Sequence, residues 1–131
     1  MSKKAFARRQ PIVIRVFVAE KEDERWMWLE GDSSPQDFLD TIPEPLVFTF
    51  RWPTWKDDVA FQDEGMEVIN GILKINGSKM RRKRFEILLT SWNLTTDDDQ
   101  PLIIDPQNID SLDPDLGNIV MDRLDKVLGK I

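Results

Sequence analysis

The sequence contains no cysteine, no histidine and no tyrosine among its 131 residues. The absence of cysteine excludes disulfides, thiolate metal sites and cysteine nucleophiles, and it favours a reducing compartment. The absence of histidine removes the usual general base near pH 7 and the commonest transition-metal ligand. No carboxylate pair lies beside a positioned base, and neither a glycine-rich phosphate loop nor a nucleophile elbow occurs. We therefore expect a protein without enzymatic activity and without a cofactor.

Long apolar runs are also missing, since no stretch of about 18 apolar residues occurs. Residues 1–10 carry several basic side chains ahead of an apolar segment, as a signal peptide does, but Arg15 interrupts that segment and no small-residue cleavage site follows. We interpret residues 1–10 as a flexible basic arm and residues 11–131 as one domain. We expect no membrane partner and a cytoplasmic location.

The net charge of the chain is negative, and the acidic residues are unevenly distributed along it. The chain has 18 basic and 24 acidic residues, for a net charge of −6, and the excess lies in residues 93–131, where aspartates far outnumber basic residues. Because sequence-independent affinity for DNA or RNA comes from basic groups, we expect no nucleic-acid partner. An inhibitor or regulator that mimics charge through this acidic segment is one alternative function.

The N-terminal half shows the pattern of a sheet. Apolar residues alternate along residues 12–18, and residues 25–30 and 46–52 are rich in aromatic or β-branched side chains, which predicts three strands, the first two joined as a hairpin. Ser34 and Pro35 have the pattern of a helix start, which predicts about one turn of helix before Pro43. The expected result is a small antiparallel sheet of about three strands within residues 11–52.

The second half, residues 54–131, is expected to be helical. Thr54 is a candidate N-cap, and a set of residues after it recurs at helical spacing, which predicts a helix that ends between residues 70 and 76. The members of this set are Trp55, Val59, Gln62, Met66, Ile69 and Leu73. A second amphipathic helix is predicted to start near Ser78 and to reach Trp92.

Two further helices are predicted where an aspartate precedes a proline, at Asp105-Pro106 and at Asp113-Pro114. The last of these helices is expected to run to about residue 128 and to end at Gly129. With three or four helices after a small sheet, the predicted fold class is α+β.

Two charged segments allow more than one interpretation. Residues 79–84 place five cations on the second helix, and these can meet either the aspartates of the same chain's C-terminal part or an acidic partner surface. The triplet at residues 97–99 resembles the start of a calcium loop, but Pro101 and Leu102 occupy positions where an EF-hand needs an oxygen ligand and a glycine. We interpret this triplet as an exposed turn. Of the five tryptophans we expect most to be buried, including Trp55, and one or two to be exposed.

Several stretches from residue 48 onward together resemble a known family. They are Phe48-Thr49-Phe50-Arg51-Trp52-Pro53-Thr54-Trp55, Leu88-Leu89-Thr90-Ser91-Trp92-Asn93-Leu94, Gln100-Pro101-Leu102 and Asn108-Ile109-Asp110-Ser111-Leu112-Asp113-Pro114. Over roughly residues 46–128 the chain resembles the tail assembly chaperones of long-tailed bacteriophages.

This resemblance implies a non-enzymatic assembly factor in the host bacterial cytoplasm that binds the tape measure protein and tail-tube protein and is absent from the mature virion. A possible homo-oligomer is also implied. The alternative is a structural virion component, such as a tail-completion or connector subunit.

The candidate partner-binding residues lie on the helices predicted between residues 54 and 92 and between residues 114 and 128. They are Trp55, Met66, Arg81, Arg82, Lys83, Arg84, Leu88, Trp92, Leu116, Val120 and Leu124. If the basic group binds a partner, charge reversal across residues 81–84 is expected to weaken that binding and leave the fold intact.

Overall fold

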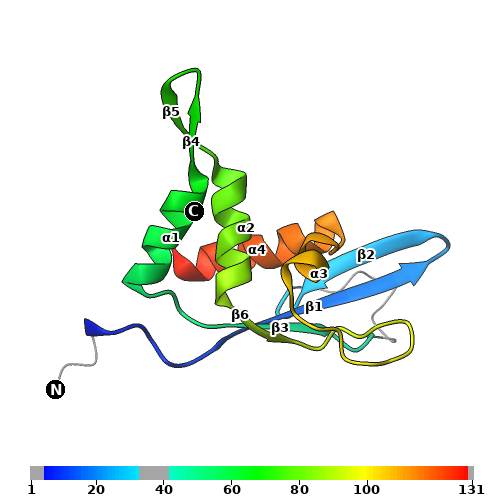
Figure 1. The fold of residues 1–131 in the computed structure, drawn as a ribbon. Helices are drawn as coiled ribbons and strands as arrows, with labels where there is room; N and C mark the ends of the chain where they lie inside the picture. Colours follow the sequence, from blue (N-terminus) through cyan, green and yellow to red (C-terminus); the bar gives the residue numbers. More distant parts are fainter. Residues whose placement is uncertain (1–4, 33–41, 130–131) are drawn as a thin grey trace.

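The computed structural model describes residues 5–32 and 42–129, and these form an α+β fold (Figure 1). The predicted fold class is therefore confirmed. The single turn of helix predicted after Ser34 lies outside the described residues.

An antiparallel sheet forms the base of the molecule in Figure 1. Its strands, in the spatial order β2-β1-β3-β6, are β2 (Glu24–Leu29), β1 (Ile12–Lys21), β3 (Leu46–Phe50) and β6 (Leu89–Trp92). The alternation in β1 buries Ile12, Ile14 and Val16 on one face, as period-two patterning requires. β1 and β2 are joined by Glu22 and Asp23, whose φ angles of 55° and 64° suit a two-residue hairpin turn that follows the strand twist.

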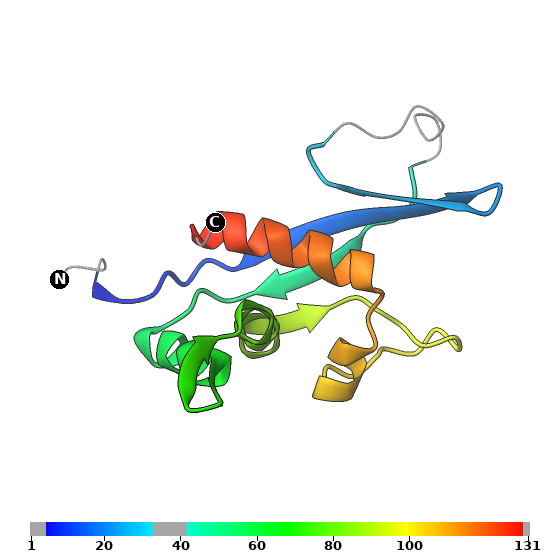
Figure 2. The same ribbon diagram turned by 90° about the horizontal axis from the view of Figure 1, so that it is seen from above.

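The helices of the described residues lie on one side of this sheet. α4 (Pro114–Leu128) runs along the sheet beside β1, as Figure 2 shows from above. α1 (Trp55–Gly65) and α2 (Gly77–Leu88) pack side by side and stand away from the sheet in Figure 1. The short α3 (Pro106–Asp110) precedes α4.

The predicted helix ends follow the local chemistry of the chain. Thr54 caps α1 in a capping box with Asp57, and Asp105 and Asp113 cap α3 and α4 ahead of a proline at the first turn. Gly129 ends α4 with a φ of 73°, a left-handed conformation that glycine adopts without steric cost. These four predictions are confirmed.

The core lies between the sheet and the helices. Phe48 and Phe50 of β3 are fully buried, and Phe85 of α2 packs edge-on against Phe50 with the ring centroids 5.3 Å apart. Leu88 of α2 is also fully buried. Facing side chains of α4 complete the core, namely Leu116, Val120, Met121 and Leu124.

The first long helix was predicted too long. α1 ends at Gly65, and the chain continues as a β-hairpin of β4 (Met66–Ile69) and β5 (Ile72–Ile75). Asn70 and Gly71 form its turn, with φ angles of 53° and 78°. Asn-Gly is the preferred pair for such a turn because both residues tolerate positive φ, so local turn chemistry overrides the helical spacing.

The second helix was also predicted too long. α2 ends at Leu88, and Leu89 begins β6, which pairs with β3 and adds a fourth strand to the sheet of about three that we predicted. The Asn93 side chain then accepts a hydrogen bond from the Val47 backbone N–H at 2.7 Å and donates one to the Pro45 carbonyl. These contacts lie far apart in sequence, so helical periodicity alone does not reveal them.

Candidate functional site

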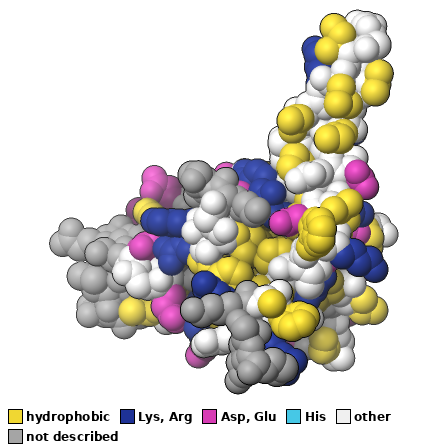
Figure 3. All heavy atoms as spheres, turned by 90° about the vertical axis from the view of Figure 1, so that its left-hand side faces the viewer, with side chains coloured by type: hydrophobic (Ala, Val, Ile, Leu, Met, Phe, Trp, Pro, Cys, Tyr) yellow, Lys and Arg dark blue, Asp and Glu magenta, His cyan; other side chains and the backbone are white. Residues whose placement is uncertain are grey.

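The β4–β5 hairpin projects from the ends of α1 and α2, away from the body of the molecule (Figure 1). Most of the exposed large apolar side chains in the described part of the chain lie on this hairpin and on α1. We call this set the apolar arm; it comprises Trp55, Val59, Met66, Val68, Ile69, Ile72, Leu73 and Ile75. Figure 3 shows hydrophobic side chains along the projection and continuing at its base.

The strand register of the hairpin decides which of its side chains share a face. Met66 pairs with Ile75, and Val68 pairs with Leu73, so these four apolar side chains lie on one face of the hairpin. The two intervening pairs lie on the opposite face, Glu67 with Lys74 and Ile69 with Ile72. One face of the hairpin is thus wholly apolar, with Val68 71% and Ile75 74% exposed.

Polar contacts at the base fix the hairpin to the helices. The Asn76 backbone N–H donates to the Gly65 carbonyl at 2.6 Å, which closes the base of the hairpin. Glu67 forms an ion pair with Lys79 of α2, and the hydrogen bond from Lys79 lowers the pKa of Glu67. Gly65 leaves room for Met80, because a Cβ at position 65 would lie 2.0 Å from the Met80 Cγ. These contacts therefore fix the position of the hairpin relative to α1 and α2.

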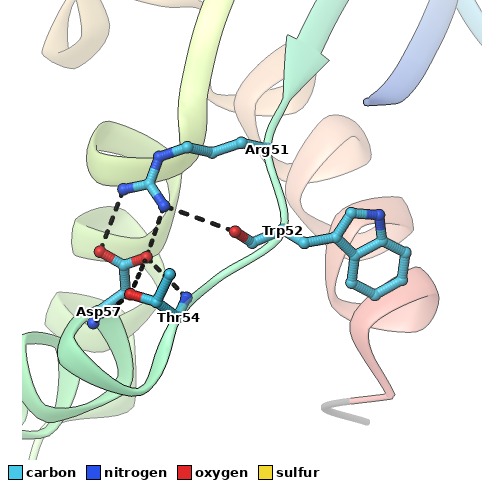
Figure 4. A network of polar contacts seen from close by, with 4 residues as sticks. All are labelled: Arg51, Trp52, Thr54 and Asp57. Carbon is cyan, nitrogen blue, oxygen red and sulfur yellow. Dashed lines mark hydrogen bonds and ion pairs between the residues drawn. The ribbon is translucent and has the colours of Figure 1, made fainter. Parts of the chain in front are cut away.

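The start of α1 is held by a second polar network (Figure 4). The Arg51 guanidinium donates to both carboxylate oxygens of Asp57, at 2.5 and 3.1 Å. The Thr54 backbone N–H also donates to Asp57, at 2.8 Å. Asp57 is buried, and the hydrogen bond from Arg51 lowers its pKa to about 2. This network fixes the direction in which α1 leaves the sheet, and Trp55 is exposed at the first turn of α1.

The basic residues of α2 face the acidic C-terminal part of the same chain. Arg81 bonds to Asp122 and to Asp125, at 2.6 and 3.0 Å, and Arg84 bonds to Asp125 at 3.0 Å. Arg84 and Asp125 are both buried. Arg82 pairs with Asp110. Of the two pairings we left open for this basic segment, the one within the molecule is therefore observed.

These pairings also reduce the unpaired negative charge that a charge-mimicking inhibitor would use. Asp110, Asp122 and Asp125 form ion pairs with arginines of α2, and Asp113 pairs with Arg25 of β2. A large part of the C-terminal negative charge is thus matched inside the molecule. The exposed triplet at residues 97–99 remains on the surface as an acidic turn.

The candidate residues predicted from sequence divide into three groups. Trp55 and Met66 are exposed in the apolar arm, and the exposure of Trp55, at 86%, corrects our expectation that it is buried. Leu88, Leu116, Val120 and Leu124 are consumed by the core, because both amphipathic helices turn these side chains toward the sheet.

The remaining candidates are at the surface of the body or at its margin. Arg81, Arg82 and Arg84 form ion pairs with aspartates. Lys83 is half-buried and has no ion pair among the described residues. Trp92 is half-buried, and its indole N–H donates to the Leu102 carbonyl at 2.7 Å. None of these five residues belongs to the apolar arm, whereas Trp55 and Met66 do.

A groove of about 300 Å³ lies between α2 and the start of α4. Phe85, Ile109 and Met121 contribute its apolar lining, while Arg82 and Asp110 at its margin are already paired with each other. Among the described residues no group of three or more acidic side chains could hold a metal ion. The groove is therefore a surface depression, and its lining residues form no arrangement of reactive groups.

The hairpin is the exposed element that the pattern of the sequence did not lead us to predict. Its signal was present in the sequence, because Asn70-Gly71 lies between Val68-Ile69 and Ile72-Leu73, and this pattern is the strongest short-range indication of a β-hairpin. The same apolar residues also partly fit helical spacing, which predicts a longer helix instead of the hairpin.

No helix in the described residues is long and apolar enough to cross a membrane. Comparison of the chain with models of protein families, with curated protein sequences and with solved structures finds no significant match.

Proposed function

We propose that this protein is a non-enzymatic phage tail assembly chaperone that binds the tape measure protein and tail-tube protein in the host bacterial cytoplasm and is not retained in the mature virion. The observation that carries the proposal is the apolar arm. Its exposed side chains project from a body whose core is already closed by α2, α4 and the sheet. The family named in the proposal rests on the resemblance of residues 46–128 alone.

Apolar surface that stays exposed to water is costly in free energy. Monomeric proteins rarely expose a large contiguous apolar patch, and such a patch marks a site where another molecule binds. The apolar arm is also separate from the core, so its side chains contribute little to folding of the body. A long helical client exposes apolar stripes of its own before assembly, and the arm can cover such a stripe. Many copies on one client would raise each other's effective concentration.

Co-expression with a tape measure protein tests this proposal. The wild-type protein is expected to raise the soluble fraction of the client, and the double variant Val68→Ser/Leu73→Ser is expected to lose most of this effect. The matched control is Ile103→Ser/Val127→Ser, which removes two exposed apolar side chains outside the arm. An unchanged soluble fraction with the wild-type protein, at matched expression, would contradict the proposal.

A structural virion component is the second candidate, because a projecting apolar hairpin also suits insertion between neighbouring subunits. Mass spectrometry of purified particles separates the two functions. A chaperone is expected to be missing from the particles, whereas a structural subunit is present in a fixed copy number.

A further inference from the structure

We propose that the apolar arm binds an amphipathic helix of about 20 residues whose apolar stripe is flanked by lysine or arginine. This inference rests on the proposed function in one respect, namely that the arm binds a segment of another protein. It adds the secondary structure, length and charge of that segment.

The length follows from the continuity of the arm. Trp55, Val59 and Gln62 lie on one face of α1 at helical spacing, and Met66 continues this series as the first residue of β4. The hairpin extends away from the sheet in the same general direction as α1 in Figure 1; α1 has eleven residues and each hairpin strand has four. At about 1.5 Å per helical residue and about 3.3 Å per strand residue, the arm is roughly 30 Å long, which is the length of a helix of about 20 residues.

The helical form follows from backbone hydrogen bonding. Along α1 the backbone N–H and C=O groups are used within the helix itself, so an extended segment that docked there would find no backbone partners. An amphipathic helix satisfies its own backbone and needs only an apolar surface. Over about half of the arm, therefore, a helix is the favoured occupant and an added strand is not.

The area of the arm is sufficient for a stable contact. Each of its eight apolar side chains is at least 43% exposed. The six that lie on the α1 stripe or on the apolar face of the hairpin together present on the order of 700 Å², close to the area of about 800 Å² that one partner contributes to an interface of standard size. A helix that covers both the α1 stripe and the apolar face of the hairpin can use most of this surface.

The basic flanks follow from charge. α1 and the hairpin together carry five acidic residues and two lysines, and Arg51 and Lys79 match the charges of Asp57 and Glu67, which leaves a small excess of negative charge. Asp63 directly follows stripe residue Gln62 on the helix, is exposed, and has no ion pair in the described part of the chain. The whole chain has a charge of −6. A cationic segment is therefore attracted to the margin of the arm, whereas a second copy would place like charges side by side.

Two synthetic 20-residue peptides test the inference with the full-length protein. Both carry the same leucine stripe at helical spacing; one has lysine and the other has glutamate beside the stripe. We expect the lysine peptide to bind about tenfold more tightly at low salt, and we expect this ratio to fall at 0.5 M NaCl because salt screens exposed charges. Binding is measured by titration calorimetry, and circular dichroism is expected to show a gain of helix in the complex.

Two pairs of variants separate the contributions of charge and apolar contact. Asp63→Lys is expected to weaken lysine-peptide binding about three- to tenfold, while Asp98→Lys, the same charge change in the exposed turn at residues 97–99, is expected to have little effect. Val68→Ser/Leu73→Ser is expected to abolish measurable binding of either peptide, while Ile103→Ser/Val127→Ser retains it. Trp55 is expected to shift its fluorescence to shorter wavelength on binding, a change lost in Trp55→Phe.

Equal or tighter binding of the glutamate peptide would overturn the inference, and so would failure of both peptides to bind. A concentration-dependent dimer in analytical ultracentrifugation that Val68→Ser/Leu73→Ser dissolves would assign the arm to a second copy and overturn it as well. If neither peptide binds but co-expression still solubilises the client, the inference fails and the proposed function stands. If the lysine peptide binds and the client stays insoluble, the proposed function fails and the inference stands.

Discussion

At the scale of single residues, the buried ion pair between Arg84 and Asp125 links α2 to α4. Asp125 also accepts a hydrogen bond from Arg81, so one carboxylate serves two guanidinium groups. The attraction between such groups offsets the cost of removing them from water, and loss of one partner leaves the other charge buried and unmatched. These residues therefore maintain the fold, which changes the expected outcome of charge reversal across residues 81–84 from weaker partner binding to unfolding.

Asp125→Ala is expected to lower the free energy of unfolding by about 3 kcal/mol, because the Arg84 charge remains buried without its partner. Urea denaturation followed by tryptophan fluorescence measures this change, and Asp98→Ala serves as the control at an exposed aspartate. The double variant Arg84→Leu/Asp125→Leu is expected to recover part of the loss. A change below about 0.5 kcal/mol in Asp125→Ala, within the range of an ordinary surface substitution, would contradict the structural role.

The lowered pKa of Asp57 predicts a dependence of stability on pH. A carboxyl group whose pKa falls from 3.8 to about 2 on folding contributes stability that is fully present above its unfolded pKa and is lost as the pH falls through its folded pKa. We expect a contribution of about 1–2 kcal/mol above pH 5, with solvent screening of the half-exposed Arg51 already considered.

Urea denaturation of the wild type and of Asp57→Asn across pH 5 to pH 2 checks this prediction. The difference in unfolding free energy between the two proteins is expected to be largest at pH 5 and to shrink toward pH 2. Asp98→Asn is the control and is expected to show no such trend. A difference that grows as the pH falls would have the wrong sign for this ion pair.

At the scale of elements, the β4–β5 hairpin depends on its own turn. Gly71 has a φ of 78°, and a Cβ placed on it would meet no neighbouring atom within 4 Å, so a substitution there strains the backbone without causing a clash. Gly71→Val is expected to cost the hairpin about 1–2 kcal/mol, because a β-branched residue disfavours positive φ.

Amide hydrogen exchange checks the effect of Gly71→Val. Protection is expected to fall in residues 66–75 and to be retained in β1, β3 and α4. The analogous change at Gly77, which has no positive φ and open space around it, is the control. A uniform loss of protection across the sheet would show that the hairpin and the core unfold as one unit.

At the scale of the whole molecule, the structure separates a closed body from a projecting arm. The ends of the hairpin meet at its base, where the Asn76 N–H bonds to the Gly65 carbonyl. Replacement of residues 67–74 by a short Gly-Ser turn is therefore expected to leave the unfolding free energy of the body within about 1 kcal/mol of the wild type. The same variant is expected to lose its effect on client solubility.

Thermal and urea unfolding, with near-UV circular dichroism as a measure of tertiary packing, test this separation. The sheet tryptophans Trp26, Trp28 and Trp92 are retained in the shortened chain and report on the body. Retained packing together with lost client binding would fit an independent docking arm. Loss of near-UV signal would show instead that the arm supports the core.

Features that depend only on neighbouring residues could be predicted from the amino-acid sequence. The alternation at residues 12–18, the caps at Thr54, Asp105 and Asp113, and the end of α4 at Gly129 all follow from local geometry and hydrogen bonding, and all are found in the structure. The α+β class follows from the same signals. The Asn70-Gly71 turn was also readable locally, but it competed with a helical spacing that was misleading.

Which amphipathic faces are covered could not be predicted from local patterns. Leu88 and Leu124 carry the same kind of sequence signal as Trp55 and Met66, yet the first two are buried and the last two are exposed. Likewise, Arg81, Arg82 and Arg84 are matched by aspartates that lie 28 to 44 positions further along the chain. Periodicity shows that a side of a helix is apolar or basic, but the partner of that side is set by the packing of distant segments, because burial is a property of the whole fold.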